Sequence, residues 1–101
     1  MKMSINKVEI KYDTLEFIML QIERNIYELK RRYNSDDLKI LMPNWIKGIF
    51  YSYHRQKVSI IDFNYLYGVE ILPHYKNEIV VFNDNYSVNN VNQYLVITVE
   101  L

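Results

Sequence analysis

Few residues of this sequence have the type and spacing that enzymatic chemistry requires. The two histidines, His54 and His74, have no carboxylate or second histidine at a spacing typical of metal sites, so we expect each at the surface. No serine sits in a Gly-x-Ser-x-Gly elbow, which would present it as a nucleophile. With Gly48 and Gly68 as the only glycines, no glycine-rich phosphate-binding loop can form.

The remaining chemical groups predict no catalytic centre either. Asp36 and Asp37 are adjacent carboxylates in a predicted loop, a position typical of a solvated turn or cap. A glycosidase-like carboxylate pair needs a cleft, and 101 residues leave little room for one. The absence of cysteine excludes disulfides and thiolate metal sites. We therefore expect a protein that is not an enzyme, with no catalytic residue, cofactor or metal ion.

Two groups of basic residues could contact nucleic acid. Basic side chains supply phosphate contacts, and aromatic rings interleaved with them supply stacking surfaces for bases. The formal net charge of zero argues against non-specific binding, and the first group is also expected as the basic end of a helix. Nucleic-acid binding is therefore an alternative function, and its expected contacts are Lys30, Arg31, Arg32, Lys47 and Lys57.

The chain has ten tyrosines, more than one small core needs. Tyrosine is rigid and amphipathic, and it is a preferred residue at recognition surfaces. Residues 51–55 and 64–67 concentrate these side chains in two short segments. We expect these segments to contact a protein partner. The predicted partner-binding residues are Tyr51, Tyr53, His54, Arg55, Tyr65 and Tyr67.

These groups need a scaffold, and residues 13–33 are its best-defined part. Apolar residues recur there at steps of three and four, which predicts a helix with one buried stripe. Asp13 is the expected N-cap, and Glu16 completes a pattern like a capping box. Such a helix is about 30 Å long and can cover one face of a small sheet. The expected stripe is Leu15, Ile18, Met19, Ile22, Ile26, Leu29 and Tyr33.

A second helix is predicted over residues 44–56. Apolar residues repeat there at helical spacing, directly after Pro43. Gly48 is a weak point that costs about 1 kcal/mol relative to alanine. The alternative is a pair of strands, because Tyr51 and Tyr53 are good strand formers.

The N-terminal segment is the least regular part of the sequence. Residues 5–12 alternate loosely, with Val8, Ile10 and Tyr12 on one side, and predict a half-buried strand that leads into the first helix. A helix that begins earlier, near Ser4, is the competing interpretation.

Five further segments predict the rest of a sheet. Residues 38–42 are a short apolar run that suits a buried strand, and residues 58–64 form a short strand or a connector. Residues 65–72 and 78–82 predict a β-hairpin with a five-residue loop, in which Gly68 marks a bulge or a turn. Residues 94–100 predict a last strand, which could lie at a sheet edge and pair with another chain in a homo-oligomer.

The order of these elements predicts a single α+β domain over residues 1–101. Strands that follow an early helical half favour a mainly antiparallel or mixed sheet of four to five strands, with the helices packed on one face. The N-terminus lacks the apolar region of a signal peptide, and no apolar run approaches the ~18 residues needed to span a membrane. We therefore expect a cytoplasmic protein with no membrane partner.

In its composition the chain resembles small proteins of low-GC phages and mobile elements. It is short and free of cysteine and alanine, and it is rich in Asn, Ile, Lys and Tyr, whose codons are AT-rich. Many such proteins bind a host protein, including defence-system inhibitors of the anti-CRISPR type, and others are virion parts. Residues 38–83, with Gly-Val-Glu-Ile and Glu-Ile-Val-Val, are similar to segments of phage structural proteins.

This resemblance implies a phage- or mobile-element-encoded protein that occludes a surface of a host protein in the host cytoplasm. A virion structural or assembly protein is the first alternative, and nucleic-acid binding is the second.

Overall fold

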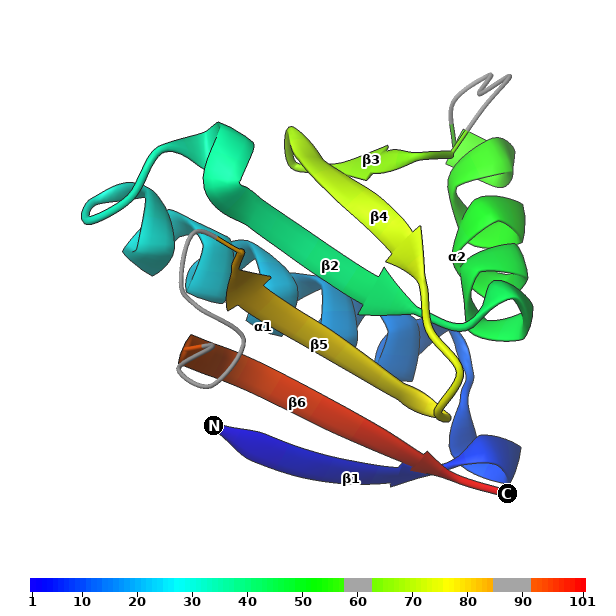
Figure 1. The fold of residues 1–101 in the computed structure, drawn as a ribbon. Coiled ribbons are helices and arrows are strands. Elements are labelled where there is room, and N and C mark those ends of the chain that lie inside the picture. Colours follow the sequence, from blue (N-terminus) through cyan, green and yellow to red (C-terminus); the bar gives the residue numbers. More distant parts are fainter. Residues whose placement is uncertain (58–62, 85–91) are drawn as a thin grey trace.

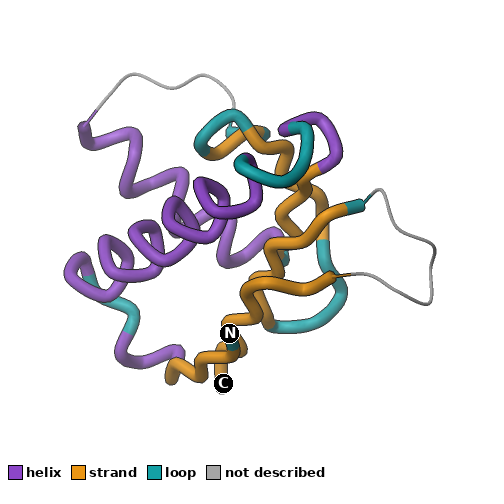
Figure 2. The backbone as a smooth tube through the Cα atoms, turned by 90° about the vertical axis from the view of Figure 1, so that its left-hand side faces the viewer, coloured by secondary structure: helices purple, strands orange, loops and turns teal. Residues whose placement is uncertain are grey.

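Over the residues that the structure describes, the fold is a six-stranded mixed sheet with two α-helices on one of its faces (Figures 1 and 2). The predicted α+β class is confirmed, with six strands in place of four to five. The helices are α1 (Tyr12–Lys30) and α2 (Asn44–Lys57). The strands are β1 (Lys2–Asn6), β2 (Leu38–Met42), β3 (Tyr65–Leu66), β4 (Val69–Pro73), β5 (Glu78–Asn83) and β6 (Asn92–Glu100).

The computed structural model describes residues 1–57, 63–84 and 92–101. Side chains are described for all of these except residues 35, 55–57 and 92–94. Most of the strand or connector predicted at 58–64 therefore lies outside the described residues.

Helix α1 packs its predicted stripe against the sheet. Leu15, Ile18, Ile22, Ile26 and Leu29 are buried in the core, and the two remaining members of the stripe pack against it half-buried. Burial of this face stabilises the helix more than any local signal does, because most helical stability in proteins comes from the packing of an amphipathic face. The prediction of the helix and of its inward face is confirmed, but the helix ends at Lys30 rather than at the predicted Tyr33, which lies beyond it.

The predicted cap of α1 is wrong. The helix begins at Tyr12, so Lys11 takes the cap position and makes no side-chain capping hydrogen bond. Asp13 lies inside the first turn, where its negative charge interacts favourably with the positive end of the helix dipole. Thr14 Oγ1 donates to the carbonyl oxygen of Glu9 at 2.8 Å and connects the helix to the preceding turn.

The first strand lies earlier than predicted. Strand β1 ends at Asn6, whose side chain accepts a hydrogen bond from the Val8 backbone N–H at 3.0 Å and starts a 3-10 turn over Lys7–Glu9. Met3 and Ile5 consequently face the core, whereas Val8 is 81% exposed. The predicted inward side of residues 5–12 is therefore wrong at Val8.

The segments at 38–42 and 44–56 are confirmed as β2 and α2. The predicted hairpin between 65–72 and 78–82 is wrong. Strand β2 lies between β4 and β5, running parallel to β4 and antiparallel to β5. A connection of four residues suffices to cross one intervening strand, because β4 and β5 are then about 10 Å apart. Leu38, Ile40 and Met42 on one face of β2 are buried, and Lys39 and Leu41 on the other face are half-buried, which suits a central position.

The last strand is central too, contrary to the prediction of a free edge. Strand β6 pairs with β5 on one side and with β1, in parallel, on the other. The edges of the sheet are β1 and β3. The prediction failed because the pairing partner of β6 comes from the other end of the chain.

The sheet face turned away from the helices carries a row of aliphatic side chains. Leu72, Leu41, Val80 and Val96 lie opposite one another across four neighbouring strands. Val80 is buried at 3% exposure and the other three are half-buried. The sheet is therefore apolar on both sides at its centre.

Candidate functional site

The tyrosines of α2 are used by the fold. Tyr53 is 6% exposed and donates its hydroxyl hydrogen to Glu16 Oε1 at 2.7 Å. Tyr51 is half-buried and packs against the core. His54 Nδ1 lies 2.9 Å from the Phe50 carbonyl oxygen. These three predicted partner residues are thus buried or half-buried, while the side chains of residues 55–57 lie outside the described residues.

The tyrosines of the β3–β4 turn differ from each other. Tyr65 is 62% exposed, whereas Tyr67 is half-buried against the core. Tyr67 has φ of +53° and Gly68 has φ of +79°, as a tight two-residue hairpin turn of type I′ requires. Positive φ is unusual for a bulky residue and costs free energy. The predicted turn at Gly68 is confirmed.

Contacts from α1 hold Tyr67 in this conformation. Lys30 Nζ donates to the Tyr67 carbonyl oxygen at 3.0 Å. Partial burial, followed by the charge and hydrogen bond of the nearby Glu23 carboxylate, raises the pKa of the Tyr67 hydroxyl. Glu16, Glu23 and Lys30 are spaced by seven residues and so share one flank of the helix. This α1 flank therefore connects α1 to α2 and to the β3–β4 turn.

Among the predicted nucleic-acid contacts, Lys30, Arg31 and Lys47 have partners within the fold. Lys47 Nζ donates to Asn64 Oδ1 at 2.8 Å. Lys30 and Lys47 therefore both donate hydrogen bonds to residues 64–67, the segment that contains β3. Arg31 lies 3.8 Å from Glu28 and stacks on Tyr27. The hydrogen bond with Tyr27, and then the Glu28 charge, raise the pKa of Arg31.

The end of α1 forms a small polar hollow of ≈ 340 Å³. Lys30, Arg31 and Arg32 line it together with Tyr33, Asn34 and Asp37. The hollow unites the three residues of the first basic group. Lys57, at the far end of the second group, has no described side chain. Nucleic-acid binding by these residues stays a prediction.

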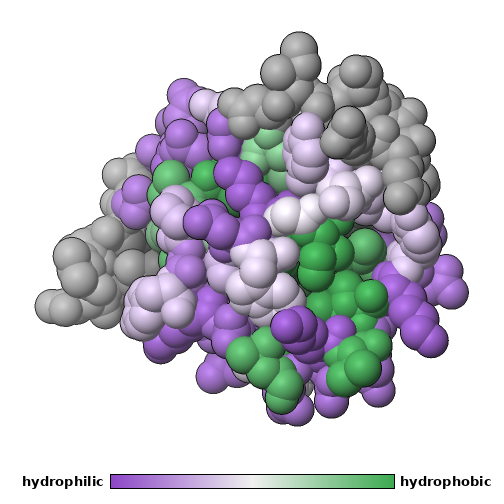
Figure 3. Space-filling view, turned by 90° about the vertical axis from the view of Figure 1, so that its right-hand side faces the viewer, coloured by the Kyte–Doolittle hydropathy of each residue, from purple (hydrophilic) through white to green (hydrophobic). Residues whose placement is uncertain are grey.

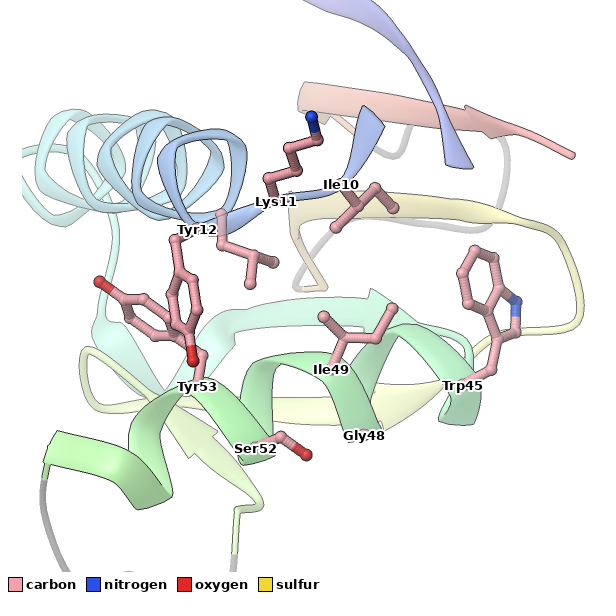
Figure 4. A pocket seen from close by; sticks show the side chains of 9 residues that line it. Ile10, Lys11, Tyr12, Trp45, Gly48, Ile49, Ser52 and Tyr53 are labelled. Carbon is pink, nitrogen blue, oxygen red and sulfur yellow. The ribbon is translucent and has the colours of Figure 1, made fainter. Parts of the chain in front are cut away.

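A larger, apolar hollow lies between the start of α1 and helix α2. It has a volume of ≈ 550 Å³ and is open to solvent. Figure 4 shows Trp45 at one end, Tyr12 and Tyr53 at the other, and Ile10 and Ile49 between them. Figure 3 faces this side of the molecule and shows apolar atoms bordered by polar ones. The α1–α2 groove is lined by Ile10, Lys11, Tyr12, Leu15, Trp45, Gly48, Ile49, Ser52 and Tyr53.

Local contacts fix the aromatic walls of the groove. Trp45 Nε1 donates to Asn77 Oδ1 at 2.8 Å, and the Lys7 ammonium lies 5.0 Å from the centre of the Trp45 ring. The Tyr12 and Tyr53 rings are 5.5 Å apart. The walls are therefore formed without any partner.

The groove was missed in the sequence because no single element contains it. Trp45, Ile49 and Tyr53 repeat at helical spacing, a pattern that indicates core packing. One signal was present: Gly48 lies on the same side of α2 as its neighbours in this stripe. A Cβ atom built at Gly48 has nothing within 4 Å. The residue predicted as a weak point of the helix thus keeps the groove open.

The two histidines differ from the predicted surface positions. The His74 side chain is 8% exposed and its Nε2 lies 3.0 Å from Glu78 Oε1, because the 74–77 connection folds back on β5. His54 is half-buried, with its ring 4.9 Å from that of Phe63. Within the described part of the chain, no group of three or more His, Cys, Asp or Glu residues could hold a metal ion.

No helix in the described ranges is long and apolar enough to cross a membrane. No protein-family model, curated protein or solved structure matches this chain.

Proposed function

We propose that this chain is a non-enzymatic protein-binding module that covers a surface of a host protein. The observation that carries the proposal is the α1–α2 groove, an apolar hollow of ≈ 550 Å³ with aromatic walls. Sites that receive a ligand commonly have about 300–1,000 Å³ and are lined by apolar and aromatic side chains with a few polar groups. The groove has the size and lining to take a small cluster of apolar side chains from a partner.

The rigidity of the walls favours binding. Trp45 is held by Asn77, and Tyr53 is held by Glu16. Side chains that are already fixed lose little conformational entropy when a partner arrives. Tryptophan and tyrosine are also the residues that most often dominate the free energy of protein association.

The rim of the groove indicates the chemistry of the partner. Lys11 lines the groove, and the Lys7 ammonium lies 5.0 Å from the centre of the Trp45 ring. Cations around an apolar contact favour partners with nearby carboxylates and orient them. We therefore expect the partner to present an apolar segment flanked by aspartate or glutamate.

Such binding lets a domain act without catalytic groups. By covering a functional surface of a host protein, the module would exclude that protein's substrate or assembly partner. Inhibition of a component of a defence system is the most concrete form of this proposal. A virion structural or assembly protein would instead use the same groove for a neighbouring subunit.

The groove can be filled from within by one substitution. In Gly48→Leu the new side chain would enter open space, since the built Cβ meets nothing within 4 Å. Gly48→Ala is the matched control, because both substitutions raise helix propensity by a similar amount of about 0.8–1 kcal/mol while alanine adds only a methyl group. Host lysate is passed over the immobilised wild type and both variants, and bound proteins are identified by mass spectrometry.

We expect a partner that the wild type and Gly48→Ala retain and Gly48→Leu loses. With that partner purified, a titration followed by Trp45 fluorescence should show affinity at least about tenfold weaker for Gly48→Leu. Trp45 is the only tryptophan, so its emission reports directly on the groove. Equal capture by all three proteins would contradict the assignment of the groove.

Labelled single-stranded and duplex oligonucleotides test the nucleic-acid alternative. We expect no binding, because Lys30 and Lys47 already donate hydrogen bonds within the fold. Binding that falls steeply with salt, and that is lost in a variant with alanine at Arg31 and Arg32, would favour the alternative over the proposal.

A further inference from the structure

The outer face of α1 carries a second surface, separate from the groove and from the α1 flank. It faces away from the buried stripe, because the helical rotation places its residues on the opposite side of the helix. Phe17, Leu20 and Tyr27 are 48%, 41% and 61% exposed, respectively, which is unusual for three large side chains in one line. The outer stripe of α1 comprises Asp13, Phe17, Leu20, Arg24, Tyr27 and Arg31.

The residues of the outer stripe are placed symmetrically about its centre, and the two residues at each pair of mirrored positions are complementary in character. Residues 13 and 31, residues 17 and 27, and residues 20 and 24 each lie equally far from residue 22. Reversal of the helix direction therefore places an acid opposite a base, an aromatic ring opposite an aromatic ring, and a leucine opposite an arginine stem. A surface with this property is complementary to itself, which is the requirement for a two-fold interface.

We propose that a second copy of this chain binds the outer stripe, with the two α1 helices antiparallel around a two-fold axis at residue 22. In this arrangement Asp13 pairs with the partner's Arg31, and Phe17 packs on the partner's Tyr27. Leu20 covers the aliphatic stem of the partner's Arg24, which keeps its charged end in water. Antiparallel packing of neighbouring helices is a standard arrangement of helical bundles.

The charges along α1 favour this occupant over an unrelated one. The outer stripe is acidic at its start and basic at its end, so two antiparallel copies attract at both ends, whereas parallel copies repel. The three charged residues of the α1 flank, Glu16, Glu23 and Lys30, already have partners in α2 or the β3–β4 turn. Arg31 contacts Glu28 and the Tyr27 ring within its own chain, and such exposed contacts are weak enough to be exchanged at little cost.

Cysteine cross-linking tests the register directly, because the chain contains no cysteine. Phe17→Cys and Tyr27→Cys are prepared as separate single variants. Positions 17 and 27 are about 15 Å apart on one helix, too far to bridge within a chain. In the proposed dimer they are adjacent across the interface. Under mild oxidation we expect a covalent dimer when the two variants are mixed, and much less from either variant alone. Equal cross-linking of a single variant with itself would overturn the antiparallel register.

Charge reversal tests the same interface without cysteine. Sedimentation equilibrium of the wild type should show a monomer–dimer equilibrium, and a wild type that is monomeric at concentrations up to about 1 mM would overturn the proposal. We expect Asp13→Arg and Arg31→Asp each to weaken dimerisation about tenfold, and the double variant to recover it. Lys76→Asp, on an exposed loop, changes the net charge as Arg31→Asp does and is expected to leave the dimer intact. A double variant as weak as the single ones would overturn the predicted ion pair.

Discussion

The α1 flank and the outer stripe of α1 lie on adjacent sides of one helix and differ in what they contact. On the flank, Glu16, Glu23 and Lys30 contact tyrosines of α2 and of the β3–β4 turn. Rotation by less than a quarter of a turn leads to the outer stripe, where Phe17 and Tyr27 remain open to solvent. Residue type alone therefore does not separate structural from available aromatic residues in this protein. The decisive factor is whether another element lies beside that side of the helix.

The α1–α2 groove lies where the contact between α1 and α2 ends and the two helices separate. The Tyr12 and Tyr53 rings meet at one end of the groove, and towards Trp45 the two helices leave the hollow between them open. Gly48 contributes no side chain to fill it. The hydrogen bond between Glu16 of the α1 flank and Tyr53 thus fixes one aromatic wall of the groove.

Replacement of a buried side chain of α1 by alanine should cause the largest loss in the free energy of unfolding. Ile22 is fully buried, so Ile22→Ala removes apolar contacts and leaves a cavity, at a cost of about 2–5 kcal/mol in the free energy of unfolding. Leu20→Ala, two residues away on the outer stripe, is expected to change it by less than about 0.5 kcal/mol. Urea unfolding of both variants, at concentrations where the wild type is monomeric, measures the contrast. Similar losses would show that the outer stripe is buried.

The two glycines should respond to alanine with opposite signs. Gly68 has φ of +79° in the turn that the α1 flank holds, so Gly68→Ala should destabilise the fold by about 1–2 kcal/mol through backbone strain. Gly48 lies in a helix beside open space, so Gly48→Ala should stabilise it by up to about 1 kcal/mol. Thermal unfolding of the two variants distinguishes the signs. Stabilisation by Gly68→Ala would mean that the turn relaxes to another conformation.

Removal of the Tyr53 hydroxyl should have a smaller effect. In Tyr53→Phe the bond to Glu16 is lost while the ring still packs in the core, at an expected cost of about 0.5–1.5 kcal/mol. Tyr65→Phe, at a 62% exposed side chain of the β3–β4 hairpin, should change stability by less than about 0.5 kcal/mol. Equal effects in urea unfolding would argue that the bond across the α1 flank contributes nothing.

Elements with a strong periodic pattern could be predicted from the sequence. The buried stripe of α1, the helix α2 and the strand β2 are visible because one buried face imposes a regular spacing on apolar residues. Capping was predicted less well. Glu16 was expected to face the helix start but bonds to Tyr53 instead, a partner 37 residues away that no local pattern indicates.

Strand pairing and the groove could not be predicted for a related reason. The spacing of two apolar segments around a turn suggests that they pair with each other. Strands β4 and β5 instead both pair with β2, which lies between them. Strand β6 is central only because β1 returns to it from the other end of the chain. The groove depends on the gap between α1 and α2, which is a property of the pair of helices rather than of either sequence.

Ionisation of the Tyr67 hydroxyl beside the α1 flank should have the smallest effect on stability, and it should be seen as a dependence of stability on pH. Partial burial and Glu23 raise the pKa of Tyr67 in the folded state above its unfolded value near 10. The stability that comes from the protonated hydroxyl is therefore fully present below pH 10 or so, and it is lost as the pH rises through the folded pKa.

Urea unfolding between about pH 8 and 11 should thus show a steeper loss of stability for the wild type than for Tyr67→Phe. Other tyrosines titrate in the same range, so the difference between the two proteins is the informative quantity. Glu23→Gln should give an intermediate slope, because it removes the neighbouring charge and leaves the burial of the Tyr67 ring. Parallel pH profiles of the wild type and Tyr67→Phe would mean that the Tyr67 hydroxyl is solvated. The contact between Glu23 and the β3–β4 turn would then contribute nothing to the difference between the α1 flank and the outer stripe.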